Sequence, residues 1–247
     1  MGENMRQMAG AVVDQIASLV YPPRCAVCDR VLRVGQSMHC PGCLGHLRPV
    51  KEPLCCKCGK PLAEEALYCT DCAQKQTTFL YGYGMFVYDR ALQTSILRFK
   101  YHGRREYAAF YAFQMYQKYG SWLAANQIQA MVPVPVHKNR FRKRGYNQAA
   151  LLARELGRLT GIPVREDLVL RCRDTLPQKQ MGGAVNRLAN LREAFCPGEI
   201  RAGHTGLQRV VLIDDIYTTG STIEACAQVL CALKIPAVFF LTIGIGE

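Results

Sequence analysis

The sequence predicts an α/β protein in which helices flank a mostly parallel sheet, with a small cysteine-rich domain ahead of it. Two observations support this prediction. Nine of the 13 cysteines lie before residue 73, and eight of these form four C-x-x-C pairs. Beyond residue 79, short apolar runs typical of strands buried on both faces are followed by segments with helical periodicity. The length of 247 residues accommodates one large domain and one small one.

Residues 1–23 are expected to form a short amphipathic helix. Their apolar side chains follow helical spacing until two prolines end the segment: Ala9, Val12, Val13, Ile16, Leu19 and Val20, then Pro22 and Pro23. Polar residues at positions 14 and 15 interrupt the apolar part, so the segment differs from an export signal. No window offers the roughly 18 consecutive apolar residues that a membrane-spanning helix needs. We therefore expect a cytoplasmic protein whose first helix docks on the protein itself rather than on a membrane.

Residues 24–78 are expected to bind two structural zinc ions. Two thiolates three residues apart can face one ion, and two such pairs complete a tetrahedral site. The candidate ligands are Cys25, Cys28, Cys40, Cys43, Cys55, Cys58, Cys69 and Cys72. In the simplest arrangement the pairs combine sequentially, so that the first two share one ion and the last two share the other. The alternative is an interleaved cross-brace, in which the first and third pairs share an ion.

The other cysteines and the nearby histidines are weaker candidates for metal ligands. Cys56 is expected to be a free thiol, and His39 and His46 are expected to face the solvent. Four later cysteines share no spacing pattern and are expected to be small buried residues: Cys172, Cys196, Cys226 and Cys231. Residues 73–79 lack periodicity and are expected to link the zinc domain to an α/β domain that spans residues 79–247.

The most informative stretch is residues 209–222. Its apolar run at 210–213 predicts a buried parallel strand, with Asp214 and Asp215 at the C-terminal end, where ligands of open α/β sheets bind. A helix is predicted over residues 222–233. The loop before it offers hydroxyls, a glycine and backbone N–H groups to an anion, through Thr218, Thr219, Gly220, Ser221 and Thr222. Because two carboxylates suit a vicinal diol, the pattern predicts a sugar-phosphate site; an ordinary helix-capping turn is the alternative.

A basic segment follows residues 131–136, which are expected to form a second strand that runs into a loop. Residues 137–148 are expected to form a loop, with five cations between positions 138 and 144 and no acid. A helix should follow, with a stop at Gly161 and an apolar side made of Leu152, Ala153, Leu156 and Leu159. Such a charge run is typical of a solvated face or of a nuclear or nucleic-acid patch.

Residues 171–195 have the composition of a mobile lid followed by a short helix. The segment combines breakers with spaced cations: Pro177, Gly182, Gly183, Lys179, Arg187 and Arg192. A lid that closes over a site excludes water from the reaction. A long surface loop is the alternative interpretation.

The stretch of residues 209–222 resembles the phosphoribosyl pyrophosphate (PRPP) motif of type I phosphoribosyltransferases. The resemblance implies that Asp214 and Asp215 hold the ribose 2′- and 3′-hydroxyls and contribute to catalysis. It implies that the 5′-phosphate binds to Thr218, Thr219, Gly220, Ser221 and Thr222. Pyrophosphate, with the Mg²⁺ that accompanies PRPP, is then expected at His137, Lys138, Arg140 and Arg144. Gln178 and Arg187 are the expected catalytic residues of the closed lid.

A series of short motifs resembles the ComF family of bacterial competence-associated proteins. In chain order they are Tyr21-Pro-Pro-Arg-Cys25, Lys100-Tyr-His-Gly-Arg104, Val132-Pro-Val-Pro135, Arg144-Gly-Tyr-Asn-Gln148, residues 178–190 and the PRPP motif. The motifs cover nearly the whole chain, although residues 181–185 depart from the family's lid pattern. The resemblance implies a double zinc ribbon joined to a type I phosphoribosyltransferase-like domain.

The same resemblance implies a protein that binds PRPP–Mg²⁺ and takes part in the uptake or use of external, single-stranded DNA, together with proteins of the competence machinery. If it is an enzyme, it transfers the pentosyl group of PRPP to an acceptor that the sequence does not identify. Two alternatives stay open: a nucleobase phosphoribosyltransferase of nucleotide salvage, and a non-catalytic PRPP-sensing regulator that binds DNA. The net charge of +12 favours anionic partners, and residues 90–192 carry most of it, with 19 cations and 5 acids.

Overall fold

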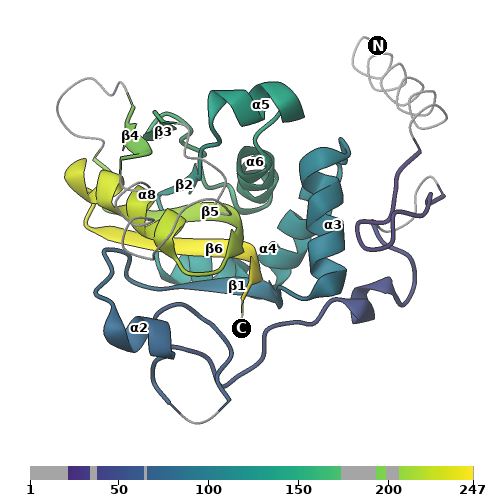
Figure 1. The fold of residues 1–247 in the computed structure, drawn as a ribbon, viewed down its shortest axis with the longest axis horizontal. Coiled ribbons are helices and arrows are strands. Elements are labelled where there is room, and N and C mark those ends of the chain that lie inside the picture. Colours follow the sequence, from purple (N-terminus) through teal and green to yellow (C-terminus); the bar gives the residue numbers. More distant parts are fainter. Residues whose placement is uncertain (1–21, 34–37, 64–65, 174–192, 199–205, 247) are drawn as a thin grey trace, which may run out of the picture.

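The computed structural model describes residues 22–33, 38–63, 66–173, 193–198 and 206–246 (Figure 1). The main sheet has four parallel strands in the order β1-β6-β5-β2, and β3 and β4 form a separate antiparallel ribbon. The strands are β1 (Gly82–Val87), β2 (Ala130–Pro133), β3 (Val169–Arg171), β4 (Phe195–Pro197), β5 (Arg209–Tyr217) and β6 (Ala237–Ile245). The helices are η1 (Cys43–His46), α2 (Thr70–Gln74), α3 (Arg90–Tyr101), α4 (Tyr107–Ala125), α5 (Lys138–Arg144), α6 (Gln148–Thr160) and α8 (Ser221–Ala232). The predicted α/β class with a mostly parallel sheet is confirmed.

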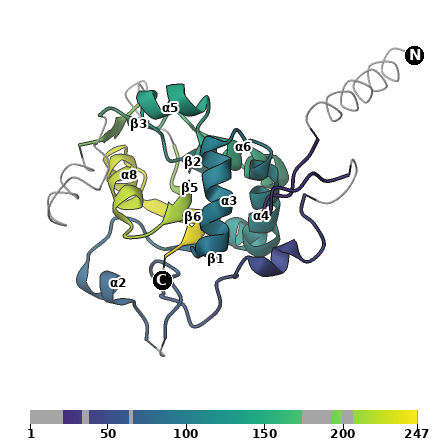
Figure 2. The same ribbon diagram turned by 45° about the vertical axis from the view of Figure 1, so that its right-hand side comes forward.

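Helices cover both faces of the main sheet (Figure 2). On one face, α3, α4 and α6 pack against Val211 and Ile213 of β5, and on the other face α8 packs against Val210 and Leu212. The faces alternate because successive side chains of a strand point in opposite directions. A strand covered on both sides has to be apolar along its length, which explains the continuous run at residues 210–213.

The boundaries of α6 follow local capping signals. The Asn147 side chain accepts a hydrogen bond of 3.0 Å from the backbone N–H of Ala149 in the first turn. Gly161 ends the helix in the left-handed conformation, with φ of 76°. The predicted apolar side is buried except at Leu159, which is 40% exposed, so the prediction is wrong for that residue.

Strand β2 ends at Pro133, within the segment that is expected to run from a strand into a loop. Strand β5 is longer than predicted and runs through Asp214 and Asp215 to Tyr217, because β6 pairs with it along this whole length. The two acids therefore lie inside β5, beyond the point where β2 stops pairing with it at Ile213.

The basic segment is a helix rather than the predicted loop. Helix α5 begins after His137, whose ring nitrogen accepts a hydrogen bond from the Asn139 backbone N–H at 3.2 Å. It ends at Gly145, whose φ of 77° suits a left-handed cap. These caps on either side define a helix that the charge pattern alone does not reveal.

The predicted linker is partly ordered and partly buried. Helix α2 extends to Gln74, and Phe79 is fully buried among aromatic residues of the α/β domain. The Phe79 ring meets the rings of Tyr217 and Phe240 edge-on, with centroids 6.4 and 5.2 Å apart. Residue 79 is thus part of the core, and the prediction of a plain polar link is wrong there.

The later cysteines do not share one environment. Cys226 is buried, as predicted. Cys172 and Cys196 form a disulfide beside the β3–β4 ribbon, and Cys231 is exposed. For these three, the prediction of small buried residues is wrong.

Two predicted elements lie outside the described residues: the N-terminal helix before Pro22, and the lid between β3 and β4 with Gln178 and Arg187. In the described part of the chain, no helix combines the length and the apolar character required to cross a membrane.

Candidate functional site

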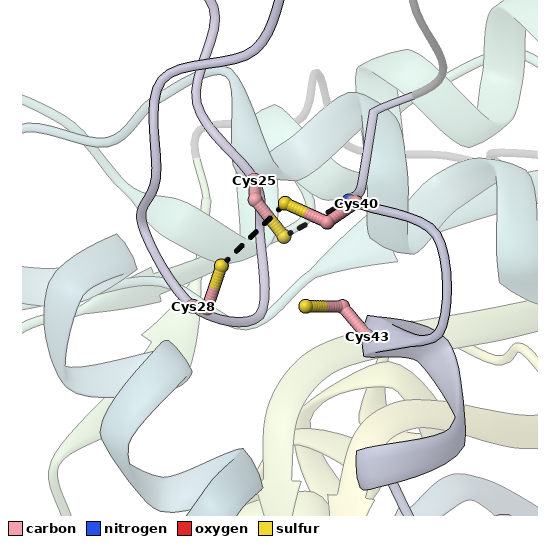
Figure 3. Close-up of side chains that lie close together, drawn as sticks. All are labelled: Cys25, Cys28, Cys40 and Cys43. Atoms are coloured by element: carbon pink, nitrogen blue, oxygen red, sulfur yellow. Dashed lines mark hydrogen bonds between the residues drawn. The ribbon is translucent and has the colours of Figure 1, made fainter.

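The eight predicted zinc ligands form two clusters of four, grouped sequentially and not as a cross-brace. The first tetrad is Cys25, Cys28, Cys40 and Cys43, and the second tetrad is Cys55, Cys58, Cys69 and Cys72. Within each tetrad all sulfur atoms lie within 4.8 Å of one another. The Sγ atoms of Cys28 and Cys40 are 3.7 Å apart (Figure 3), and those of Cys58 and Cys69 are 3.6 Å apart. A tetrahedral zinc ion with bonds of about 2.3 Å holds its sulfurs roughly 3.8 Å apart, so both tetrads fit structural zinc.

The backbone of each tetrad favours a thiolate at its first cysteine. Burial by itself would raise the pKa of Cys25 and Cys55, but backbone N–H groups directed at each sulfur lower the pKa to about 7. One of these donors is the N–H of Cys40, which lies 3.4 Å from Cys25 Sγ (Figure 3). Because the thiolate is the form that binds zinc, this geometry assists metal binding at neutral pH.

Residues next to the tetrads mostly follow the sequence predictions. Cys56 is an exposed free thiol, and His46 is exposed. His39 is half-buried and meets the ring of Phe110 edge-on at 5.7 Å, so the prediction that it faces the solvent is wrong.

Hydrogen bonds connect the turn that carries the first tetrad to α3 and to the start of α4. Asp29, in the turn after Cys28, accepts two hydrogen bonds from the Arg104 guanidinium, at 2.8 and 3.1 Å, and one from the Tyr107 hydroxyl at 2.6 Å. Burial opposes the charge of Asp29, but these donors outweigh it and lower the pKa of the carboxyl. The hydroxyl of buried Ser95 in α3 also donates to the Ala26 carbonyl within this turn.

The second tetrad lies beside the first turn of α8. Thr78 donates to the Glu224 carboxylate twice, from its backbone N–H at 2.8 Å and from its hydroxyl at 2.6 Å. A cavity of about 90 Å³ separates α2 from α8, and its lining includes Asp71, Lys75, Thr219, Ser221 and Glu224. This zinc site therefore adjoins residues 218–222, which we call the anion loop.

Asp214 and Asp215, which we call the acid pair, are buried near the C-terminal end of β5. Their exposed fractions are 8% and 5%. Lys100 of α3 places its Nζ 2.5 Å from Asp215 Oδ2, and the Gln148 amide donates to the same oxygen at 3.2 Å. Asp214 accepts a hydrogen bond from the backbone N–H of Asp215 at 2.8 Å.

Burial and the neighbouring charges set the protonation of this cluster. Burial lowers the pKa of Lys100, but the attraction of Asp215 outweighs it, so the pKa is raised and the ammonium stays charged. Burial, followed by repulsion from Asp215, raises the pKa of Asp214 well above its ordinary value. A negative charge on Asp214 is therefore disfavoured by burial and by the neighbouring acid.

The motif of residues 144–148 ties α5, α6 and the acid pair together. Arg144 donates to Gln148 Oε1 at 2.9 Å and to the Tyr101 hydroxyl at 2.8 Å. The buried Tyr146 donates to the Phe99 carbonyl, and the Asn147 amide donates to the Val134 carbonyl. A chain of contacts thus runs from Tyr101 through Arg144 and Gln148 to Asp215.

The anion loop follows the acid pair and leads into α8. Gly220 has φ of 76° and is buried; a side chain there would collide with the Tyr217 hydroxyl, so the backbone conformation and the lack of space both require glycine. Thr218 and Thr219 are exposed, Ser221 and Thr222 are half-buried, and the Thr219 and Ser221 hydroxyls lie 3.0 Å apart. Polar groups at the start of a twelve-residue helix are suited to binding an anion.

The structure separates the four residues that the resemblance implicates in pyrophosphate binding. Arg144 joins the network of the acid pair through Gln148. His137 caps α5, Lys138 is exposed and Arg140 is half-buried. The sequence alone does not reveal the role of Lys100 or Gln148, although both lie in motifs that resemble the ComF family. Their partner Asp215 is more than sixty positions away in the chain.

Comparisons with known proteins agree with these features. Residues 16–73 match the family model of a double zinc ribbon domain. The chain is 29% identical over 215 residues to Competence protein F of Haemophilus influenzae, which covers 86% of this chain and 92% of the relative. DNA utilization protein YhgH of Escherichia coli K12 gives the same identity and coverage. Competence protein ComFC of Bacillus subtilis is 27% identical over 197 residues, 77% of each chain.

The similarity therefore extends well beyond the cysteine-rich segment. Relatives with the Competence protein F, YhgH and ComFC names match most of the chain, and the two tetrads have the geometry that a double zinc ribbon requires. Together, these relatives and the double zinc ribbon match support assignment of the chain to the ComF family.

Proposed function

We propose that the protein binds PRPP with Mg²⁺ at the acid pair and anion loop, and that it serves the uptake or use of external DNA in the cytoplasm. The acid pair carries the first part: two buried acids lie near the C-terminal end of β5, which leads into a glycine turn and the start of α8. Burying two acids together is costly, so a ligand role accounts for them better than packing does. The second part rests on the relatives named for competence and DNA utilization.

In this proposal the acid pair holds the ribose diol. The side chains of Asp214 and Asp215 accept hydrogen bonds from the 2′- and 3′-hydroxyls, and the ion pair with Lys100 orients Asp215. The backbone N–H groups and hydroxyls of residues 218–222 bind the 5′-phosphate at the start of α8. Bound Mg²⁺ offsets the negative charge of the pyrophosphate group.

The reaction that this arrangement supports is displacement of pyrophosphate from C1 of the ribose. The bond from C1 to the pyrophosphate oxygen breaks, an acceptor forms the new bond to C1, and pyrophosphate leaves with the electron pair. The protein contributes positioning and electrostatic stabilisation. We assign the leaving group to His137, Lys138, Arg140 and Arg144, and the closing of the site to Gln178 and Arg187 of the lid.

Isothermal titration with PRPP–Mg²⁺ tests the site. The Asp214→Ala/Asp215→Ala double variant should bind at least about 100-fold more weakly than the wild type, since charged hydrogen bonds contribute about 1.5–3 kcal/mol each. The matched control is Glu166→Ala/Asp167→Ala, which removes two adjacent acids that pair with arginines on the surface. Equal binding by the wild type and the acid-pair variant would disprove the proposed site.

A panel of nucleobases and nucleotides tests the reaction separately. Release of pyrophosphate with one acceptor would establish a phosphoribosyltransferase and identify its substrate. Tight PRPP binding without release for any acceptor would instead favour a PRPP-sensing protein. Both outcomes leave the location of the ligand site intact.

A further inference from the structure

Helix α5 and the end of α3 form an exposed surface that combines cations with aromatic rings. We call it the α5 surface, and its members are Tyr101, Lys138, Arg140, Phe141, Arg142 and Lys143. It lies beyond the C-terminal end of β2, at the top of Figure 1. Arg144 links it to the acid pair through Gln148, so this surface adjoins the proposed PRPP site.

Helix stability accounts for only some of the cations of this surface. Arg142 and Lys143 lie in the last turn of α5, where the helix dipole favours positive charge. Lys138 and Arg140 lie in the first turn of α5, where the helix dipole disfavours positive charge. Lys138 and Arg142 are four residues apart, as are Arg140 and Arg144, so like charges face each other and destabilise the helix. Within the described part of the chain, Lys138, Arg140, Arg142 and Lys143 form no ion pair. An anionic partner relieves this repulsion.

Two aromatic rings lie among these cations. The exposed fractions of Tyr101 and Phe141 are 59% and 49%. The Arg144 guanidinium lies 4.5 Å over the Tyr101 ring and donates to its hydroxyl, which fixes the orientation of the ring. Phe141 shares a helix face with Arg144, three residues away. Exposed rings beside cations are typical of surfaces on which unpaired bases stack.

Other anions explain the surface less well. Pyrophosphate has no ring to stack, and the exposed Arg142 and Lys143 are not among the residues that we assign to it. Duplex DNA presents its phosphates to cations but keeps the faces of its bases stacked inside the helix. A single strand offers both phosphates and unstacked bases, so it matches both kinds of side chain.

We infer that the α5 surface is a platform for single-stranded DNA, on which Arg142 and Lys143 contact phosphates and Phe141 and Tyr101 stack on bases. This inference rests on the DNA part of the proposed function. Deoxyribose lacks a 2′-hydroxyl, so the strand offers the acid pair no vicinal diol along its length. DNA and PRPP therefore occupy adjoining sites and are expected to bind at the same time.

Fluorescence anisotropy with a labelled oligothymidylate of about 20 nucleotides tests the stacking. Phe141→Ala should weaken binding roughly tenfold, because a stacked base loses its partner ring. Phe141→Trp, which keeps a ring, should restore affinity to near the wild-type level. Both variants should bind a duplex of equal length as the wild type does, and thermal unfolding should show that they remain folded.

The salt dependence of affinity tests the phosphate contacts. Arg142→Gln/Lys143→Gln should reduce the slope of log affinity against log salt by roughly 1.4, since each lost single-strand contact removes about 0.7. The control Arg158→Gln/Lys234→Gln removes the same charge from the ends of α6 and α8 and should leave the slope unchanged.

The outcomes of these experiments distinguish the DNA part of the proposed function from the proposed α5 surface. A wild-type protein that binds no oligothymidylate at low salt would refute the DNA part of the proposed function and this inference with it. A wild type that binds, with Phe141→Ala and the Arg142/Lys143 variant equal to it in affinity and slope, would refute the α5 surface alone. PRPP titration of the same variants should match the wild type, since none of the substituted residues belongs to the proposed PRPP site.

Discussion

The two cysteine tetrads are built from the same kind of C-x-x-C pair, but they lie against different parts of the α/β domain (Figure 1). The first packs with the helices on one face of the sheet, α3 and α4, while Cys55 and Cys58 of the second pack with the side that carries α8. The fastening groups differ as well. Asp29 holds the first through a guanidinium and a phenol, and Thr78 holds the second through the Glu224 carboxylate.

Because of this difference, each half of the candidate site lies next to a helix that is held by a different tetrad. Helix α3 carries Lys100, which pairs with the acid pair, whereas Glu224 lies in the first turn of α8, directly after the anion loop. The first tetrad therefore supports the sugar end of the proposed site, and the second supports its phosphate end. Identical metal chemistry is used twice, for positions on opposite sides of one ligand.

The largest effect on the structure is expected when one tetrad loses its zinc ion and the other keeps its own. Structural zinc contributes about 10–16 kcal/mol to small zinc domains, so Cys28→Ser or Cys58→Ser should each release about one ion and unfold one tetrad. Hydrogen exchange should then accelerate mainly in α3 for Cys28→Ser and mainly in α8 for Cys58→Ser. Equal acceleration of both helices in both variants would show that the tetrads act as one unit.

Removal of the Asp29 charge, beside the first tetrad, should have the next largest effect on the free energy of unfolding. Asp29→Asn weakens the hydrogen bonds from Arg104 and Tyr107 and should cost about 2 kcal/mol in the free energy of unfolding, measured with denaturant. Asp167→Asn, at a carboxylate that is 57% exposed and paired with Arg165, should cost less than about 0.5 kcal/mol.

The pH dependence of the Asp29 effect gives a second check. The folded pKa of Asp29 lies below its ordinary value, so its contribution is complete above an unfolded pKa of about 4. The contribution disappears as pH falls through the folded pKa. The difference in stability between the wild type and Asp29→Asn should therefore shrink in acid, and a difference that grows would contradict this account.

The smallest effect on the free energy of unfolding is expected at Thr78, beside the second tetrad. Thr78→Val removes the hydroxyl bond to Glu224 but keeps the backbone bond, and should cost about 1 kcal/mol. PRPP binding should weaken slightly, because the first turn of α8 loses one fastening. Thr94→Val, at an exposed hydroxyl that bonds within α3, is the matched control and should leave PRPP affinity unchanged.

The sequence predicts the features whose chemistry is local. Cysteine spacing identifies the tetrads, and an apolar run followed by two acids and a glycine-containing loop identifies β5 and its neighbours, because each pattern fits within about twenty residues. Lys100 escapes such reasoning, since its partner Asp215 lies on a strand far along the chain. The same holds for Asp29 and Arg104, which are 75 positions apart.

Two errors of the sequence prediction have a common physical origin. The predicted strand stops before Asp214 because acids are rarely buried, and the lysine that compensates them is visible only in the tertiary structure. The predicted loop at residues 137–148 becomes α5 because caps at His137 and Gly145 define a short helix despite its repelling charges. In both places, local charge was a poor guide to the secondary structure.

The position of Phe79 has a practical consequence for expressing parts of this protein. A fragment cut at residue 80 to isolate the α/β domain would lose a fully buried ring that lies against Tyr217 and Phe240. The uncovered side of these stacked rings would adjoin the anion loop and present apolar surface to water. Fragments that begin upstream of Thr78, with the second tetrad intact, are the ones expected to stay soluble.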